Sequence, residues 1–430
     1  MSDSLRTITD VACTVCGCVC DDLEFDVSGE RITQVRRACE LAEPWLLSIN
    51  GSHPPPAGIG GEEASFEEAV DRASTLLRGS DNPLIFGLSR SSTQGQRAAV
   101  HLAERMGANI DTTASVCHGP SIMAIQQVGE STCSLGEVRQ RADLVLFWGA
   151  NPVVSHPRHF ERYSVEPAGE FVPRGRADRT VVVIDRKPTA TSEHADLFLQ
   201  VHPERDFEVI WTLRQLIRGD EVPSPADTGV SLESMRDLAA RMTGCRYGVV
   251  FFGLGLAQRG HGHITVEALL RLVAELNRHT RFSARRLRLP GDVTGADSVL
   301  CWQTGFPFAV NLARDFPRYN PGEYSANELL IRGETDCCLV VGSESTELLS
   351  PEARARLHEI PTIVLDYPHI TACWQPTVRF TTAVYGVHQP GTAYRMDEIP
   401  IPLRRVVDSP YPTDEDILNA LLARVGQVHE

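Results

Sequence analysis

The sequence predicts an α/β protein with mostly parallel, doubly wound sheets, preceded by a small strand-rich segment at the N-terminus. From residue 62 onward, short apolar runs typical of buried strands alternate with amphipathic segments of helical period. Strands joined by helices form parallel sheets that are covered on both faces. Before this region, the alternating residues of LEFDVSGERITQVR (23–36) predict a hairpin that turns at Ser28–Gly29.

Three parts are predicted along the chain. Residues 1–60 form a cysteine-bearing segment of the [4Fe-4S] type, and the Pro/Gly-rich stretch GSHPPPAGIGG (51–61) separates it from the rest. Residues 61–380 form an α/β body with two Rossmann-like halves. Residues 381–430 carry a Gly/Pro loop for a cofactor and a final helix.

The predicted elements of the body follow from its apolar runs. Strands are expected at 82–88, 143–150, 179–185, 248–255, 336–343 and 361–366. Helices are expected at 64–79, 205–219 and 265–279.

One pattern occurs twice in the body. DLVLFWGANP followed by TVVVIDRKPT resembles DCCLVVGSES followed by TIVLDYPHIT, so each pair ends on a strand-terminal aspartate, Asp185 or Asp366. In doubly wound sheets such an aspartate is placed to bind a ribose hydroxyl. The repetition predicts two related nucleotide-type sites, although ordinary turn roles remain the alternative.

Charge and hydropathy narrow the class of protein. A formal charge of −15 over 430 residues argues against nucleic-acid or anionic-membrane partners, which require a basic surface. We expect no membrane span and no secretory signal, because no apolar run approaches about 20 residues and the first residues lack an apolar core. The expected location is cytoplasmic, where clustered cysteines stay reduced and bind metal or do redox chemistry.

Four cysteines near the N-terminus have a metal-binding spacing. Cys13, Cys16, Cys20 and Cys39 read Cys-x2-Cys-x3-Cys-x18-Cys, with Cys18 as a spare. This spacing favours a [4Fe-4S] cluster. Structural zinc more often uses two separated Cys-x2-Cys knuckles, so zinc and unmetallated thiols remain as alternatives. The remaining cysteines outside SVCHGPSIMA are predicted to be core residues: Cys133, Cys245, Cys301, Cys337, Cys338 and Cys373.

The stretch SVCHGPSIMA places Cys117 and His118 just before a helix predicted to start at Pro120–Ser121. A thiolate near a helix N-terminus is favoured by the helix dipole and becomes a good nucleophile or soft-metal ligand. His118 could move protons beside it. The alternative is a buried cysteine and a hydrogen-bonded histidine.

Polar loops supply the remaining candidates. Together they are the polar rims that a large, phosphate-bearing cofactor needs. The candidate cofactor-binding residues are Gly149, Asn151, His156, Arg158, Asp185, Arg186, Thr189, Gly253, Gly255, Asp366, Gly391, Thr392 and Arg395.

Several longer motifs resemble one known family. They are VCHGP, WGANPVVSHPRH, VVVIDRKPTATSEHADLFLQV, TGFPFAVNLARDFPRYNPGE and GTAYRMDEIPIPLR. In this order along the chain they resemble the B subunits of formylmethanofuran dehydrogenases, which belong to the molybdopterin oxidoreductases. The resemblance spreads over essentially the whole chain.

This resemblance implies a molybdopterin-oxidoreductase-like fold, one [4Fe-4S] cluster, and two molybdopterin guanine dinucleotides around tungsten or molybdenum. Cys117 lies where the family places the thiolate ligand of that metal. His118 and Arg288 lie where it has a proton-handling histidine and a substrate-orienting arginine. The implied reaction interconverts carbon dioxide and formate. The implied partners are an amidohydrolase-like A subunit, subunits of the C and D types, and a ferredoxin-like electron carrier.

Two departures from the family pattern weaken the redox assignment, and the family has a second branch. Glu40-Leu41-Ala42 follows Cys39, where many molybdopterin enzymes keep a basic residue, and Leu289-Pro290-Gly291 follows Arg288, where a Gly-His pair is expected. Bacterial members of the second branch form a formyltransferase/hydrolase complex that needs no redox step. The retained cysteines favour the redox branch instead.

Overall fold

The computed structural model describes residues 5–51, 53–222, 226–258 and 261–426. The chain forms two compact units, one from Met1–Val116 and Leu289–Glu430, the other from Cys117–Arg288. These bounds differ from the predicted ones at 60/61 and 380/381. The physical reason is strand pairing, because β4 (Ala57–Ile59) and β17 (Val378–Thr381) are neighbours in one sheet.

The N-terminal segment is a three-stranded antiparallel sheet. Its strands are β1 (Arg6–Val11), β2 (Leu23–Ser28) and β3 (Arg31–Arg36), in that order. Ser28 pairs with Arg31, which confirms the predicted hairpin. The connection between β1 and β2 carries the cysteine cluster. After β3 follow α1 (Ala42–Ser48) and the 3-10 turn Ile49–Gly51.

The first unit also contains a nine-stranded sheet. Its order is β14 (Arg318–Tyr319), β13 (Val310–Asn311), β7 (Asn109–Thr112), β6 (Pro83–Gly87), β15 (Cys337–Val341), β16 (Thr362–Asp366), β17, β4 and β5 (Glu62–Ala64). The five strands from β7 to β17 are parallel, whereas the pairs at both edges are antiparallel. The strand order reverses between β6 and β15.

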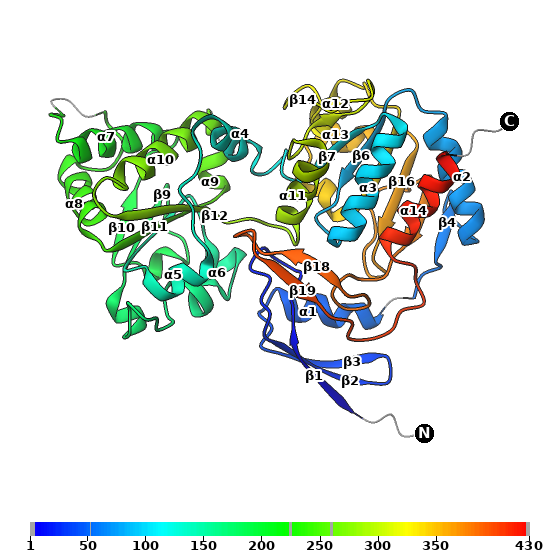
Figure 1. Ribbon diagram of the computed structural model, residues 1–430, viewed down its shortest axis with the longest axis horizontal. Helices are drawn as coiled ribbons and strands as arrows, with labels where there is room; N and C mark the ends of the chain where they lie inside the picture. Colours follow the sequence, from blue (N-terminus) through cyan, green and yellow to red (C-terminus); the bar gives the residue numbers. More distant parts are fainter. Residues whose placement is uncertain (1–4, 52, 223–225, 259–260, 427–430) are drawn as a thin grey trace. The chain divides into compact units, whose positions relative to one another are not determined.

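Helices cover both faces of this sheet (Figure 1). Ile85 and Leu339 pack toward one face, which is covered by α2 (Phe66–Arg78), α3 (Thr93–Met106), α11 (Val293–Thr304) and α14 (Asp414–Val425). Their neighbours Leu84 and Val340 pack toward the other face, against α12 (Ala326–Ile331) and α13 (Pro351–Arg356). This alternation is the pattern of a strand buried on both sides. The 3-10 turn Ser343–Leu348 follows β15, and a short hairpin of β18 (Gly391–Tyr394) and β19 (Pro400–Leu403) lies near the C-terminus.

The second unit contains a five-stranded, fully parallel sheet. Its order is β10 (Leu197–Gln200), β9 (Thr180–Asp185), β8 (Leu144–Trp148), β11 (Tyr247–Phe252) and β12 (Arg281–Arg286). One face packs on α7 (Asp206–Arg218), α8 (Leu232–Gly244) and α10 (Gly262–Leu276). The other face packs on the π-helical turn Phe160–Ser164. Further elements are α4 (Gly119–Val128), α5 (Leu135–Arg141), α6 (Pro152–Ser155), α9 (Leu254–Ala257) and the 3-10 turns Gly175–Asp178 and Ser192–His194.

The predicted fold class is confirmed. All six predicted strands are present, as β6, β8, β9, β11, β15 and β16, and the predicted helices are α2, α7, α10 and α14. Within the described ranges, no helix has the length and apolar character that a membrane span requires. The prediction of core positions was wrong for Cys301 and Cys373, whose side chains are exposed, and Cys245 is only half-buried.

Candidate functional site

The cysteine loop folds back on itself at its ends. The backbone N–H of Cys13 donates to the carbonyl of Cys20 at 2.7 Å, and that of Val19 donates to the carbonyl of Cys16 at 3.1 Å. Cys13, Cys16 and Cys20 are buried, whereas Cys39, three residues before α1, is half-buried. The loop therefore brings together the N-terminal cysteines of the predicted set.

The thiols of this loop interact with one another. Burial, followed by the charges of Cys16 and Cys20, raises the pKa of Cys13 well above its usual value. Hydrogen bonds with the thiols of Cys16 and Cys20 raise the pKa of Cys18, so the spare cysteine lies between two predicted ligands. Buried thiols that oppose one another's ionisation can be thiolates together only beside a positive group, which suits a cationic metal–sulfur group. Among the residues that the structure describes, no group of three or more His, Cys, Asp or Glu side chains is arranged to hold a metal ion.

The predicted C-terminal cofactor loop packs against the cysteine loop. The N–H of Met396 donates to the carbonyl of Gly17 at 2.8 Å. The guanidinium of Arg395 pairs with the buried carboxylate of Asp397 at 2.6 and 2.7 Å. The carbonyl of Thr392 accepts from the hydroxyl of Thr93 at 3.1 Å, and Gly391 directly precedes it. The first unit thus gathers the N-terminal cysteines and this loop in one place.

Asp366 lies at the carboxyl end of β16, as predicted, and is buried. Its carboxylate accepts two hydrogen bonds from Ser343, one from the backbone N–H and one from the hydroxyl, both at 2.7 Å. The side chain therefore organises the loop after β15, next to the point where the strand order reverses.

In the second unit, Cys117 and His118 directly precede α4, and both are buried. The Nε2 atom of His118 lies 3.0 Å from the carbonyl of Leu287, and Nδ1 lies 3.2 Å from the hydroxyl of Ser121. A carbonyl can only accept, so Nε2 carries the hydrogen and Nδ1 is the acceptor. Burial, and then the charges of Arg288 and Arg286, lower the pKa of His118 well below its usual value, and its imidazole is neutral.

His156 makes the same arrangement with the next backbone carbonyl along the chain, that of Arg288. Its Nε2 atom lies 2.9 Å from the carbonyl of Arg288, and Nδ1 lies 2.8 Å from the hydroxyl of Ser155. Burial lowers the pKa of His156 to about 4. Two neutral histidines therefore bind consecutive carbonyls directly after β12. This brings His118, His156 and Arg288 together.

The glycines predicted to cradle a cofactor contact one another at the carboxyl ends of β8 and β11. The N–H of Gly255 donates to the carbonyl of Gly149 at 3.1 Å. A Cβ atom on Gly149 would lie 2.7 Å from the backbone nitrogen of Leu256, and one on Gly253 would lie 2.6 Å from the oxygen of Gly149. These glycines permit the close approach of two turns where the strand order of this sheet reverses.

The other predicted loop residues lie at this same edge and bind their own loops. Asn151 accepts hydrogen bonds from the N–H and hydroxyl of Thr191, at 3.1 and 2.7 Å. Asp185 accepts from the N–H of Arg186 at 2.7 Å, and burial raises the pKa of Asp185. Thr189 bonds to Ser192, and Arg158 pairs with Glu161.

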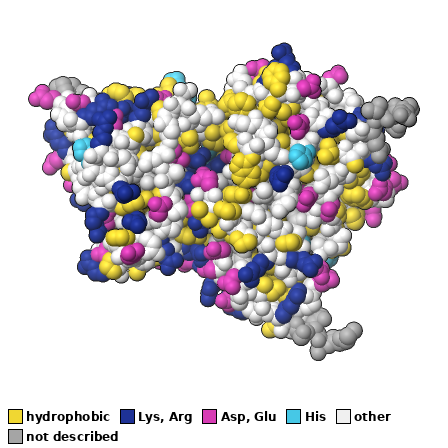
Figure 2. Space-filling model, in the orientation of Figure 1, with side chains coloured by type: hydrophobic (Ala, Val, Ile, Leu, Met, Phe, Trp, Pro, Cys, Tyr) yellow, Lys and Arg dark blue, Asp and Glu magenta, His cyan; other side chains and the backbone are white. Residues whose placement is uncertain are grey.

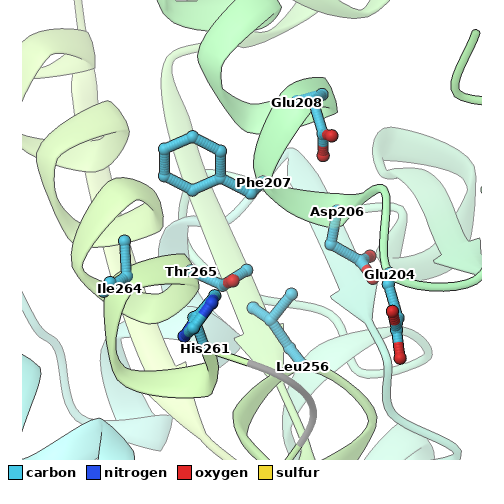
Figure 3. Close-up of a pocket in the computed structure, with 8 residues that line it drawn as sticks. All are labelled: Glu204, Asp206, Phe207, Glu208, Leu256, His261, Ile264 and Thr265. Atoms are coloured by element: carbon cyan, nitrogen blue, oxygen red, sulfur yellow. The ribbon is translucent and has the colours of Figure 1, made fainter. Parts of the chain in front are cut away.

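A cavity of about 350 Å³ lies beyond this edge of the five-stranded sheet (Figure 3). It is lined by Glu204, Asp206, Phe207, Glu208, Leu256, His261, Ile264 and Thr265. Asp206 accepts a hydrogen bond from the indole of Trp148 at 2.7 Å. Sequence reasoning missed this cavity. The available signal was the acidic run in HPERDFE, between a strand and a helix that were both predicted.

Comparison with known proteins identifies the family. No family model matches the chain. Over 434 residues it is 37% identical to the B subunit of the tungsten-containing formylmethanofuran dehydrogenase 2 of Methanocaldococcus jannaschii, covering 99% of this chain and 100% of that protein. The chain belongs to the family of formylmethanofuran dehydrogenase B subunits.

Solved structures support the fold of this family member. Acetylene hydratase from Pelobacter acetylenicus superposes with a TM-score of 0.72 at 12% identity, covering 97% of this chain and 69% of that one. A chain of the formyltransferase/hydrolase complex (FhcABCD) from Methylorubrum extorquens, in complex with methylofuran, superposes with a TM-score of 0.70 at 23% identity. That match covers 86% of this chain and 98% of that one. The chain therefore shares its fold with both of these proteins.

Proposed function

We propose that this chain is the redox subunit of a formylmethanofuran dehydrogenase-type complex, which interconverts carbon dioxide and formate. Its cofactors would be pterin-bound tungsten or molybdenum and one [4Fe-4S] cluster. The main support is identity of 37% over the full length of the B subunit of a tungsten-containing enzyme. The loop with Cys13, Cys16 and Cys20, close to Cys39, is a second support, because a non-redox scaffold has no need for these thiols.

Five cysteines of this chain would bind the two metal cofactors. The Cys117 thiolate would hold the pterin-bound metal, and Cys13, Cys16, Cys20 and Cys39 would hold the cluster. When bound, the metal–pterin group would supply two-electron exchange with the substrate carbon, and the cluster would pass single electrons onward.

Arg288 would bind the substrate, and His118 would accept and release a proton. The Arg288 guanidinium suits the carboxylate of formate, because its planar N–H groups match two carboxylate oxygens. In His118, Nδ1 is the atom that could accept a proton, since Nε2 already carries a hydrogen bound to the Leu287 carbonyl. The low pKa of His118 keeps that atom unprotonated at neutral pH.

The cavity beside Asp206 would take the base end of a pterin dinucleotide. Its carboxylates would repel a phosphate but accept hydrogen bonds from the N–H groups of a heterocycle. Phe207, Leu256 and Ile264 supply apolar walls for a planar ring (Figure 3). In the first unit, the loops near Asp366, Gly391, Thr392 and Arg395 would serve the second dinucleotide.

The proposed partners are the amidohydrolase-like A subunit, subunits of the C and D types, and a ferredoxin-like electron carrier. Acidic and basic side chains are interspersed over the face of each unit that Figure 2 shows. The net charge of −15 fits protein partners better than nucleic acid.

Elemental analysis of the complex, purified without oxygen from its host, tests the proposal. About four Fe and one Mo or W per chain are expected from the cofactor set. The Cys117→Ala variant should lose Mo or W and keep its iron. Iron without Mo or W, or neither, would contradict the redox function.

That negative result would favour a second function, as a non-redox structural subunit of a formyltransferase/hydrolase complex. The specific observation behind it is the shared fold over 98% of the FhcABCD chain. Under this alternative, formate release from a formyl carrier would continue in the Cys117→Ala variant.

A further inference from the structure

Arg90 connects the cysteine loop to the nine-stranded sheet. It lies just after β6, where the strand order of this sheet reverses. Its Nη1 atom donates to the carbonyls of Thr14 and Val15, at 3.0 and 3.3 Å, between two of the proposed cluster ligands. Its Nε atom donates to the carboxylate of Glu344 at 3.1 Å, in the turn after β15. One side chain thus holds two segments that lie far from each other in the sequence.

The position of Arg90 is enclosed. Only 9% of its side chain is exposed, and its guanidinium carbon lies 5.5 Å from the centre of the Trp45 ring in α1. The aliphatic part of the Arg90 side chain passes Gly342, and a Cβ atom added to Gly342 would lie 3.1 Å from the Cβ atom of Arg90. Gly342 also has a φ of +80°, so glycine is required there twice over. A buried cation with partners on each side is a fixed charge rather than a solvated one.

The resemblance predicts a basic residue directly after Cys39, and this chain has none there. Glu40-Leu41-Ala42 follows Cys39. Arg90 brings a positive charge to the cysteine loop in space instead, because its guanidinium donates to the carbonyls of Thr14 and Val15.

We propose that Arg90 is a positioning residue that ties the cysteine loop to the sheet edge and, by its charge, makes the bound iron–sulfur cluster easier to reduce. This inference rests on the proposed function, because it assumes that the loop holds a cluster. Reduction adds a negative charge to the cluster, and a fixed cation stabilises the more negative state. The partner carboxylate of Glu344 weakens this effect without cancelling it, because the guanidinium lies against the loop carbonyls.

The test uses the complex purified without oxygen and a redox titration followed by electron paramagnetic resonance. The signal that disappears in Cys20→Ala identifies this cluster. Arg90→Gln removes the charge, Arg90→Lys keeps it, and Glu344→Gln removes the opposing charge. The control is Arg424→Gln, which removes one positive charge from an exposed ion pair with Glu67 and Asp71 in the same unit.

We expect a lower midpoint potential in Arg90→Gln, a higher one in Glu344→Gln, and little change in Arg90→Lys and Arg424→Gln. A potential equal to that of the wild type in Arg90→Gln at full iron content would overturn the inference. If Arg90→Gln loses its iron, Glu344→Gln becomes the deciding variant. A midpoint potential in Glu344→Gln that is no higher than that of the wild type would then overturn the inference.

Hydrogen exchange separates this inference from the proposed function. In the iron-free full chain, the amides of residues 13–20 should exchange faster in Arg90→Gln than in the wild type or Arg424→Gln. A wild-type complex without iron would refute the cluster, and with it the electrostatic role. In that case, unchanged amide exchange in Arg90→Gln would also refute the role of Arg90 in holding the cysteine loop to the sheet edge. Faster exchange would support this positioning role alone.

Discussion

The imidazole of His156 donates a hydrogen bond from Nε2 to the backbone carbonyl of Arg288, at 2.9 Å. Both side chains are buried, so no water competes for this bond. Because a carbonyl can only accept, this bond fixes the tautomer with the hydrogen on Nε2, and Nδ1 lies 2.8 Å from the hydroxyl of Ser155. His156 therefore sets the backbone position from which the proposed substrate-orienting arginine starts.

Replacing His156 by alanine should lower the free energy of unfolding by about 2 kcal/mol, because the Arg288 carbonyl is left buried without its donor. Chemical denaturation at neutral pH measures this loss. The matched control is His202→Ala, since His202 is exposed and its Nδ1 atom lies 3.7 Å from the carboxylate of Asp227. That control should change stability by no more than about 0.5 kcal/mol. Equal losses in both variants would show that the carbonyl bond contributes little.

The same histidine predicts a pH dependence. Its pKa is lowered from 6.5 to about 4, so the folded chain keeps it neutral while the unfolded chain takes up a proton. Stability from this group is present above pH 6.5 and is lost as the pH falls toward 4. At about pH 5 the loss amounts to roughly 2 kcal/mol.

A comparison of His156→Gln with the wild type isolates that contribution, because all other titrating groups are shared. The glutamine variant should lose less stability than the wild type when denaturation is repeated at about pH 7 and pH 5. Identical losses would mean that His156 has an ordinary pKa in the folded chain.

Gly149 allows a prediction about the two turns at the sheet edge. With a φ of +55° and a Cβ position 2.7 Å from the nitrogen of Leu256, Gly149→Ala meets both backbone strain and a backbone clash. We expect it to lose more than about 3 kcal/mol or to misfold, judged by denaturation and circular dichroism. Gly219→Ala is the control, because Gly219 has a φ of +82° but no atom near its Cβ position. It should lose only about 1 kcal/mol, and a similar loss at Gly149 would refute the role of close packing.

Much of the fold could be predicted because its central strands are continuous apolar runs. The strand β12, RFSARR, was not predicted, since four of its residues are polar or charged and it contains no apolar run. The structure gives the reason why it is tolerated: Arg285 donates to the carbonyl of Cys133 at 3.0 Å, and Arg286 lies 3.6 Å from the carboxylate of Glu130. Such partners come from distant positions, which local patterns do not reveal.

The candidate site could be predicted less fully, for a related reason. The strand-end position of Asp366 follows from the sequence pattern, but its bonds to Ser343 do not. His156 was expected at a polar rim, whereas its side chain points inward to Arg288. Sequence spacing identifies polar residues near strand ends, and only tertiary contacts decide whether they face a ligand or their own loops.

The cysteine loop supplies the last prediction, which concerns Cys18 and Cys20. Both are buried, and Cys18 hydrogen-bonds to the thiols on each side of it. If Cys20 is a cluster ligand and Cys18 is not, Cys20→Ala should lose the visible absorption and most of the iron. Cys18→Ala should keep about four Fe per chain, because only a neutral thiol is removed. Anaerobic iron analysis and absorption spectra of the two variants measure this difference. A greater iron loss in Cys18→Ala than in Cys20→Ala would assign the ligand to Cys18 and change the spacing of the set.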